Sequence, residues 1–203
     1  MRKWKYALVM VFGISIYLTV QCLIRDNIVT AVITTSLAIV GGVAIWMEMQ
    51  SNERINEAQL IMELNNQFIT NENFADIEWA LEKYYAEYMQ AKRNGKDPAE
   101  LTLDIDLSLE NRNRQKLVNY LVHLEGVAAL VNEGVLHLDV ITDLMAYRYF
   151  IAVNNPDVQK AELLPYKDYY NGIFQIYEKW SKKLGNEKIP LAEFNLLNQV
   201  DEK

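Results

Sequence analysis

Two long apolar stretches dominate the first quarter of the chain. The first covers residues 6–24, and the second covers residues 28–47 and contains no ionisable residue. Each has about the length that an α-helix needs to cross a hydrocarbon core of roughly 30 Å. Because only three residues separate them, the pattern predicts a two-helix transmembrane hairpin in residues 1–49.

The basic residues around this hairpin predict its orientation. The N-terminal tail carries three basic residues and the turn carries one, so the tail is expected on the cytoplasmic side. Two spans return the chain to that side, which predicts a multi-pass protein of the cell membrane with both termini in the cytoplasm. Trp4 and Trp46 would then anchor the cytoplasmic interface, because indole rings favour the headgroup level.

The second apolar stretch carries small residues four positions apart. Thr34, Ala38 and Gly42 share one helix face, and such a face lets another helix approach closely in lipid. It fits either an oligomerisation contact or packing against the first span near Gly13, and we favour the second interpretation.

Beyond residue 50 the apolar positions recur at three- and four-residue steps, which predicts amphipathic helices. The second span should continue as a helical stalk, followed by a cytoplasmic bundle of about five helices in residues 50–185 and a polar tail, 186–203. The expected breaks are polar, glycine or proline positions: residues 71–73, residues 93–98, Gly134, residues 155–156 and Gly185. Asp139 is expected to cap one helix, and Pro165 to begin the last long one.

Residues 99–109 do not follow this helical pattern. Leucine and isoleucine alternate there with threonine, aspartate and serine, which is a strand signal. Nothing else in the sequence reads as a strand that could pair with it. We therefore favour an extended segment laid across the helices, although the sequence leaves a helix open.

Charge excludes one class of partner. Residues 1–49 contain four basic and two acidic residues, so residues 50–203 hold the remaining sixteen basic and twenty-five acidic ones, a net charge of −9. Phosphate attraction supplies most sequence-independent nucleic-acid affinity, so no nucleic-acid partner is expected. The single cysteine, Cys22, rules out an intramolecular disulfide.

No pattern of catalytic or metal-binding residues stands out. His123 lies among helical leucines, and His137 stands beside Asp139, whose capping role is the simpler explanation. Asp104 and Asp106 would need further oxygen ligands to hold a cation. We therefore expect no enzyme activity, no cofactor and no metal.

Aromatic residues are the one unusual feature of the predicted bundle. Tyrosines recur at helical spacing, and such rings mark binding surfaces but also fill ordinary cores. We favour packing and keep an interaction surface as the alternative. The candidates are Tyr84, Tyr85, Tyr88, Tyr169, Tyr170 and Tyr177.

The N-terminal apolar stretches and two runs of the helical part, Phe74–Leu81 and Leu117–Leu136, resemble a family of bacterial membrane-anchored, all-helical proteins of unknown function. The resemblance extends over about half of the chain. In that family a similar run ends at a glycine and is followed by an acidic cap, as Gly134 and Asp139 are here. The resemblance implies no known activity.

Together these patterns predict a membrane-tethered cytoplasmic helical module for interaction or sensing. Its expected partners are the lipid bilayer and another protein or a second copy of itself. Two alternatives remain: a small-ligand sensor with a pocket between the tyrosine-rich helices, and a membrane-bound enzyme of unrecognised type.

Overall fold

The computed structural model describes residues 13–17, 19–21, 28–185 and 188–198. These residues form an all-α structure without any β-strand, which confirms the predicted fold class at that level. They divide into two compact units, Met1–Ala58 and Gln59–Lys203. The main helices are α2 (Ile28–Thr70), α3 (Glu72–Arg93), α4 (Arg112–Asn132), α5 (Leu138–Val153), α6 (Pro156–Val158) and α7 (Asn171–Leu184).

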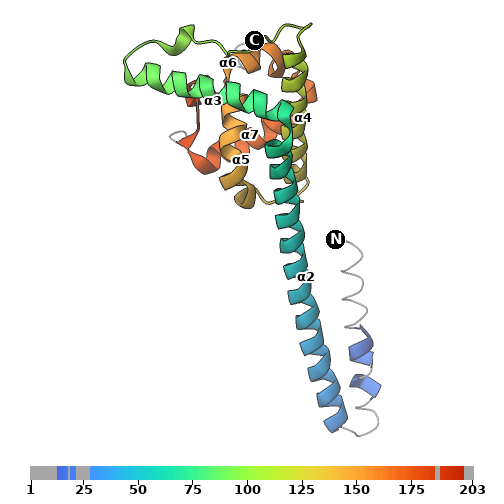
Figure 1. Ribbon diagram of the computed structural model, residues 1–203. Coiled ribbons are helices and arrows are strands. Elements are labelled where there is room, and N and C mark those ends of the chain that lie inside the picture. Colours follow the sequence, from blue (N-terminus) through green and yellow to red (C-terminus); the bar gives the residue numbers. More distant parts are fainter. Residues whose placement is uncertain (1–12, 18, 22–27, 186–187, 199–203) are drawn as a thin grey trace. The chain divides into compact units, whose positions relative to one another are not determined.

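Helix α2 runs without a break for 43 residues (Figure 1). This confirms that the helix begun in the second apolar stretch continues beyond it. Among the residues that the structure describes, however, no helix has the combined length and hydropathy of a membrane span. The predicted hairpin is therefore not supported by the described helices, and Trp4 and the turn at residues 25–27 lie outside them.

Most predicted helix ends are confirmed, and each has a local cause. The Asn71 side chain accepts a hydrogen bond from the backbone N–H of Asn73, which caps α3. Gly134, at φ +70°, ends α4 because the N–H groups of residues 134 and 135 turn back to the carbonyls of Val131 and Leu130. Gly185 ends α7 with φ +73°.

Two predicted helix starts are wrong. Helix α5 begins at Leu138 with His137 as its cap residue, and Asp139 lies in its first turn, where it pairs with Lys183 instead of capping. The last long helix begins at Asn171, well after Pro165, because residues 159–163 form a π-helix and residues 167–169 a 3₁₀ turn.

The core of the unit Gln59–Lys203 forms around α4, which packs against α3 and α7, while α3 also contacts α5. Its largest buried side chain is Trp180, which is 1% exposed and has its ring centroid 4.9 Å from that of Tyr149. The polar tips are satisfied: Trp180 Nε1 donates to Thr142 Oγ1 over 2.9 Å, and the Tyr149 hydroxyl donates to the Ile173 carbonyl over 2.6 Å. Full burial of one such aromatic ring stabilises a fold by about 1.5–3 kcal/mol.

The prediction for residues 99–109 is confirmed only in part: residues 99 and 100 belong to the 3₁₀ helix η1 (Pro98–Glu100), and residues 101–109 are irregular, with a bend at 104–105. The alternation in this segment has the expected effect: Leu103 is buried, Ile105 and Leu107 pack partly against the core, and the polar residues between them are exposed. Residues near the C-terminus also contribute to the core, since Ile189, Leu191 and Leu196 are at most 7% exposed.

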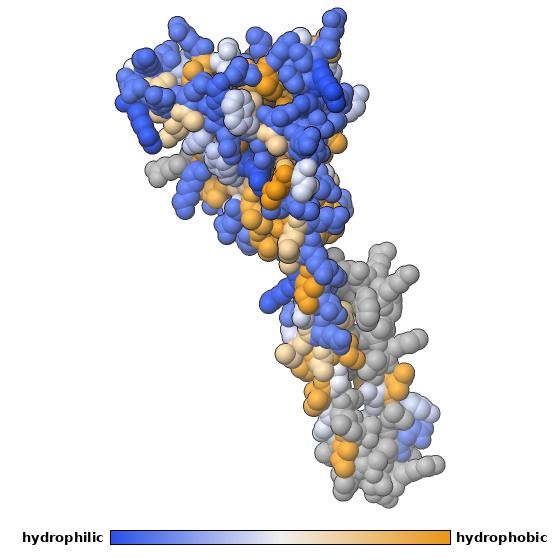
Figure 2. Space-filling view, viewed as in Figure 1, coloured by the Kyte–Doolittle hydropathy of each residue, from blue (hydrophilic) through white to orange (hydrophobic). Residues whose placement is uncertain are grey.

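The two units place their apolar side chains differently. In Met1–Ala58 the large apolar side chains that are described lie mostly at the surface, including Val40 at 66% and Met47 at 62% exposed. In Gln59–Lys203 hydrophilic residues cover much of the face seen in Figure 2, and the apolar ones are largely interior.

Candidate functional site

A groove of about 600 Å³ lies beside the extended segment 101–109. One wall is that segment, the opposite wall is formed by α6, the π-helix η2 (Gln159–Leu163) and the turn after it, and Arg114 of α4 contributes between them. The lining residues are Thr102, Leu103, Ile105, Leu107, Ser108, Leu109, Arg114, Asp157, Lys160, Ala161, Pro165 and Tyr166.

Short polar contacts hold the extended wall in place. The Leu103 N–H donates to Asp157 Oδ2 over 2.6 Å, which ties the segment to the first turn of α6. Asp104 pairs with Lys83 of α3. The Asp106 carboxylate accepts bonds from the Ser108 N–H and the Asn111 side chain, and these bonds lower the pKa of Asp106. The aspartates of this segment therefore fix the wall and are not assembled as a cation site.

The opposite wall begins where α6 starts, at a well-defined helix N-terminus. The Asn155 side chain accepts bonds from the N–H groups of Asp157 and Val158, with Pro156 at the first helical position. The following backbone widens to a π-helix, in which the Leu164 N–H donates to the Gln159 carbonyl over 3.0 Å. Single π-turns occur often at functional sites, and this one brings Lys160 and Ala161 to the groove.

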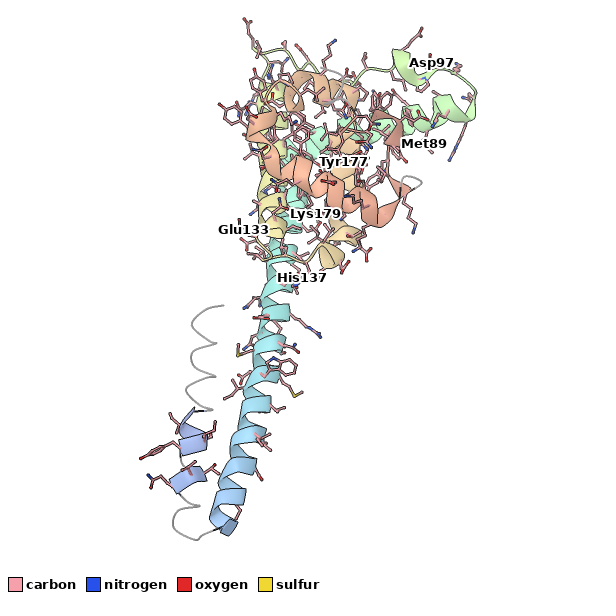
Figure 3. The ribbon with its side chains drawn as sticks, turned by 180° about the vertical axis from the view of Figure 1, so that it is seen from behind. Met89, Asp97, Glu133, His137, Tyr177 and Lys179 are labelled. Carbon is pink, nitrogen blue, oxygen red and sulfur yellow. The ribbon has the colours of Figure 1, made fainter. Side chains whose placement is uncertain are left out.

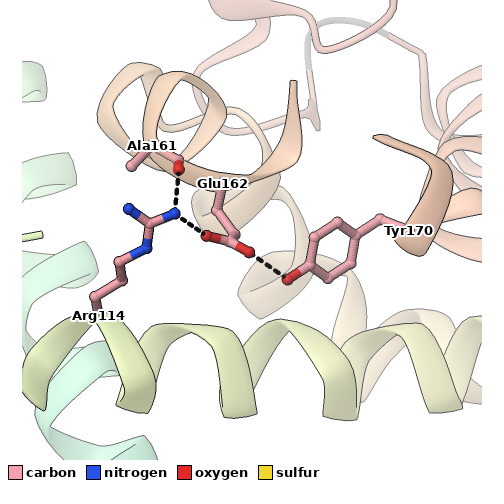
Figure 4. A network of polar contacts seen from close by, with 4 residues as sticks. All are labelled: Arg114, Ala161, Glu162 and Tyr170. Atoms are coloured by element: carbon pink, nitrogen blue, oxygen red, sulfur yellow. Dashed lines mark hydrogen bonds and ion pairs between the residues drawn. The ribbon is translucent and has the colours of Figure 1, made fainter. Parts of the chain in front are cut away.

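Glu162, which follows the lining residue Ala161, contacts side chains from two other parts of the chain (Figure 4). Its carboxylate accepts a hydrogen bond from Arg114 Nη2 at 2.9 Å and another from the Tyr170 hydroxyl at 3.0 Å. Arg114 also donates to the Ala161 carbonyl. Because Glu162 is only 6% exposed, this pairing compensates a charge that would be costly to leave alone. Burial, followed by the neighbouring Glu162 carboxylate, raises the pKa of Tyr170 well above its usual value.

The groove combines apolar walls with the exposed ammonium group of Lys160. Leu109 is 78% exposed, and the exposed Tyr166 ring lies 5.7 Å from the Arg114 guanidinium. Lys160 is exposed and has no ion-pair partner among the described residues. Arg114 is neutralised by Glu162 and Asp157 is held by the Leu103 N–H. The arrangement therefore suits an amphipathic anion and offers no activated nucleophile or acid–base pair.

A second buried network lies between α2, α3, α4 and α5. Arg148 Nε lies 2.6 Å from Glu78 Oε1, and Arg148 also donates to the Asn65 side chain over 2.7 Å. Burial raises the pKa of Glu78, and the Arg148 charge opposes that shift. His123 lies close by with its ring against Phe68, and burial lowers its pKa. No group of three acidic, histidine or cysteine side chains that could hold a metal occurs in the described part of the chain.

The candidate tyrosines do not gather on one surface. Tyr84, Tyr88, Tyr170 and Tyr177 are at most 3% exposed, and Tyr177 lies within the helical unit, donating to Asn154 (Figure 3). All four belong to the hydrophobic core, where the Tyr88 ring packs against Phe194 and the Tyr170 hydroxyl donates to Glu162. Tyr85 is half-buried and stacks on Tyr88, whereas Tyr169 is 78% exposed. None of these six lines the groove.

The candidate membrane residues are only partly described. Trp46 is 53% exposed and Gly42 is buried. Thr34 and Ala38 lie on α2, but their side chains are outside the described set, as is Trp4. The predicted packing face therefore stays a prediction.

Sequence reasoning missed the groove because it omitted residues 157–164. A signal was available, since Glu162 stands among Ala161, Leu163 and Leu164, where an acid needs a partner. Nothing in the sequence indicated that the partner would be Arg114, 48 positions earlier.

These features define a class: an all-α domain in which the irregular segment 101–109 forms one wall of a groove. The chain belongs to the family described as Domain of unknown function (DUF4760), whose model matches residues 34–155. The match includes most of α2 and reaches the end of α5, so the groove wall formed by residues 157–166 lies beyond it. No curated protein and no solved structure matches the chain.

Proposed function

We propose that the protein is a membrane-tethered, non-catalytic helical interaction module. The observation that carries this proposal is a charge-free stretch of α2, residues 28–47, whose described large apolar side chains face outward. The exposed members are Ile33, Ile39, Val40, Val43, Ile45, Trp46 and Met47, at 40–66% exposed.

Exposed apolar side chains on one short helical stretch are costly in water and favourable in lipid. A single scattered residue would need no explanation, but these seven lie within fifteen positions. The tether also depends on residues 6–24, of which the structure describes only part. In this proposal residues 6–47 make two passes, and the basic N-terminal tail keeps both termini in the cytoplasm.

The acidic unit Gln59–Lys203 would then present the interaction surfaces. Its net charge disfavours an anionic lipid surface, so its partners are expected to be proteins or small ligands. The contacts described above are structural ion pairs and caps, which supports a binding role without chemistry.

A charge-insertion experiment on the full chain tests the tether. Each lysine at the centre of a membrane helix costs about 3 kcal/mol, so the double variant Val40→Lys, Val43→Lys should be lost from alkali-washed membranes. The matched control Ser51→Lys, Asn56→Lys changes the same helix outside the apolar stretch and should stay with the membranes, as wild type does. A wild-type chain that stays in the soluble fraction as a monomer without detergent would refute the tether.

Orientation is tested separately. A cysteine at the exposed position Lys96, in a Cys22→Ser chain, should resist a membrane-impermeant maleimide in intact cells and react after lysis. Labelling in intact cells would place the helical unit outside and contradict the cytoplasmic assignment.

A second candidate function is the binding of an amphipathic carboxylate in the groove. Free Lys160 beside the apolar Leu107, Leu109 and Tyr166 favours it, because the ammonium can pair with the carboxylate while the walls cover the chain. Isothermal titration calorimetry with oleate should show binding to the wild type, and Lys160→Ala should weaken this binding about tenfold. Lys179→Ala, on α7 outside the groove, is the control. Equal binding by both variants would exclude Lys160 as the anchor.

A further inference from the structure

Residues 188–198 pack against the helices of the unit Gln59–Lys203, and we call this segment the C-terminal strap. Its regular structure is limited to 3₁₀ turns such as η5 (Ala192–Phe194), and its backbone–backbone hydrogen bonds join residues only three positions apart. Nevertheless Ile189, Leu191 and Leu196 are at most 7% exposed. The C-terminal strap is therefore held by contacts with the helices and not by secondary structure of its own.

Buried amide side chains of the helical unit bind the main chain of the C-terminal strap. Asn154 Nδ2 donates to the Pro190 carbonyl over 2.8 Å, and Gln159 Nε2 donates to the Phe194 carbonyl over 2.7 Å. Asn154 is 0% and Gln159 is 3% exposed, and the Tyr177 hydroxyl fixes the Asn154 amide by donating to its Oδ1. Hydrogen bonds to the main chain hold a peptide at a site, while apolar pockets beside them select its side chains. The surface under the strap has both features.

One acidic side chain of the C-terminal strap is also recognised. The Glu193 carboxylate accepts a hydrogen bond from the Tyr88 hydroxyl over 2.6 Å and pairs with the Lys92 ammonium. The bond from Lys92, followed by the bond from Tyr88, lowers the pKa of Glu193. The neighbouring Phe194 ring lies with its centroid 6.0 Å from that of Tyr88. Helix α3 thus contributes a contact for an acid followed by an aromatic residue.

The C-terminal strap is bound with a strained backbone. Among the described residues, Leu191 is the one non-glycine residue with a positive φ, at φ +54° and ψ 33°. A leucine in this left-handed region is strained, because its Cβ approaches the following carbonyl oxygen. Leu191 is nevertheless only 3% exposed, so its side chain is held in the core against that strain. Another segment that makes the same contacts without a left-handed leucine would bind without this cost.

We propose that the surface under the C-terminal strap is a peptide-binding site, which the strap fills in this structure and which an extended segment of another protein fills by displacing it. The partner segment has the chemistry of the strap: an acidic residue that reaches Lys92 and Tyr88, with large apolar residues on both sides. A second copy is the poorer occupant, because its strap has the same strained leucine and lacks the high local concentration of a segment in the same chain. This inference rests on the interaction role proposed above and not on the tether.

Binding of a peptide to the full chain in detergent tests the site. The probe is a fluorescein-labelled peptide with the sequence of residues 188–198, and its binding is measured by fluorescence anisotropy. Leu196→Lys places a charge at a position that is 0% exposed, so it should release the strap and bind the probe about tenfold more tightly than the wild type, or better. Asn198→Lys is the matched control, because Asn198 is exposed in the same strap. It should bind the probe as weakly as the wild type.

The charge of the probe shows where it binds. A probe with lysine in the place of Glu193 would meet Lys92 and should bind the Leu196→Lys chain about fivefold more weakly. Adding Lys92→Glu to that chain should reverse the preference between the two probes. Binding elsewhere on the protein would not reverse, and that result would overturn the proposed site.

A second measurement separates displacement from unfolding. The helical circular dichroism of Leu196→Lys should match that of the wild type, and a loss of helix would show that the strap belongs to the core and is not a displaceable ligand. Equal binding by Leu196→Lys and Asn198→Lys, or no binding by either, would overturn the site as well. A wild-type dimer that Leu196→Lys converts to monomer in sedimentation equilibrium would assign the site to straps exchanged between copies and overturn the choice of partner. None of these outcomes changes the result of the alkali wash, so a failure of the tether is seen separately.

Discussion

The two units of this protein use apolar residues in opposite ways. In Gln59–Lys203 the core encloses large apolar side chains such as Phe150 and Trp180, and the indole N–H of Trp180 donates to Thr142. In Met1–Ala58 the described side chains of the same kinds face outward, as Trp46 does. The first arrangement stabilises the fold from within, whereas the second is the arrangement on which the proposed tether rests. The same residue type therefore has a different physical role in each unit.

The sharpest test compares two tryptophans. Trp180→Ala removes a ring that is 1% exposed and should lower the free energy of unfolding by about 3–5 kcal/mol. Trp46→Ala, 53% exposed, should change it by less than about 0.5 kcal/mol. Urea unfolding of the full chain in detergent, monitored by circular dichroism, measures the free energy of unfolding of both variants. An equal loss for the two variants would remove the distinction between the units.

The buried ion pair offers a second test. Arg114→Met leaves the Glu162 carboxylate enclosed without its cation, and we expect a loss of about 3 kcal/mol in the same unfolding measurement. Lys182→Met removes a solvent-exposed partner of Glu178 and should have no measurable effect. If Arg114→Met left the free energy of unfolding unchanged, the network in Figure 4 would not stabilise the groove wall.

Replacing either of two glycines of the helical unit by alanine should change the free energy of unfolding, in opposite directions for the two positions. A Cβ at Gly172 would lie 2.7 Å from Glu125 Oε1, whose carboxylate accepts the N–H groups of Gly172 and Ile173 at the start of α7. Gly172→Ala should therefore cost about 1–3 kcal/mol of unfolding free energy. Gly126, within α4, has open space around it, so Gly126→Ala should stabilise by about 0.5–1 kcal/mol. Stabilisation by both changes would show that the Glu125 cap adapts.

The smallest expected effect is a pH dependence of the free energy of unfolding that arises from His123. Burial lowers the pKa of His123 below its unfolded value of 6.5, so the unfolded chain binds more protons as the pH falls below that value. Wild type should therefore lose more unfolding free energy than His123→Leu between pH 7.5 and 5.5. The raised pKa of Glu78 acts in the opposite direction but is common to both proteins. Identical pH profiles would contradict the burial of His123.

The sequence determined where most helices begin and end, because those signals are local. Asn71, Gly134 and Gly185 act through backbone groups a few positions away. The alternation in residues 101–109 also agrees with burial from Leu101 to Leu107 but not at Leu109, which is exposed. The sequence also determined the charge-free character of residues 28–47, which needs no neighbour to be recognised.

Only the tertiary structure decided which apolar faces are enclosed and which polar groups meet. The tyrosines of α3 and α7 have the same spacing whether they face solvent or another helix, so burial of Tyr84 and Tyr177 could not be read from the sequence. Arg114 and Glu162 meet because α4 passes beneath the π-helix, a contact between residues far apart in the chain. Sequence periodicity gives the direction of a side chain on its own helix, but what lies in that direction depends on how the helices pack.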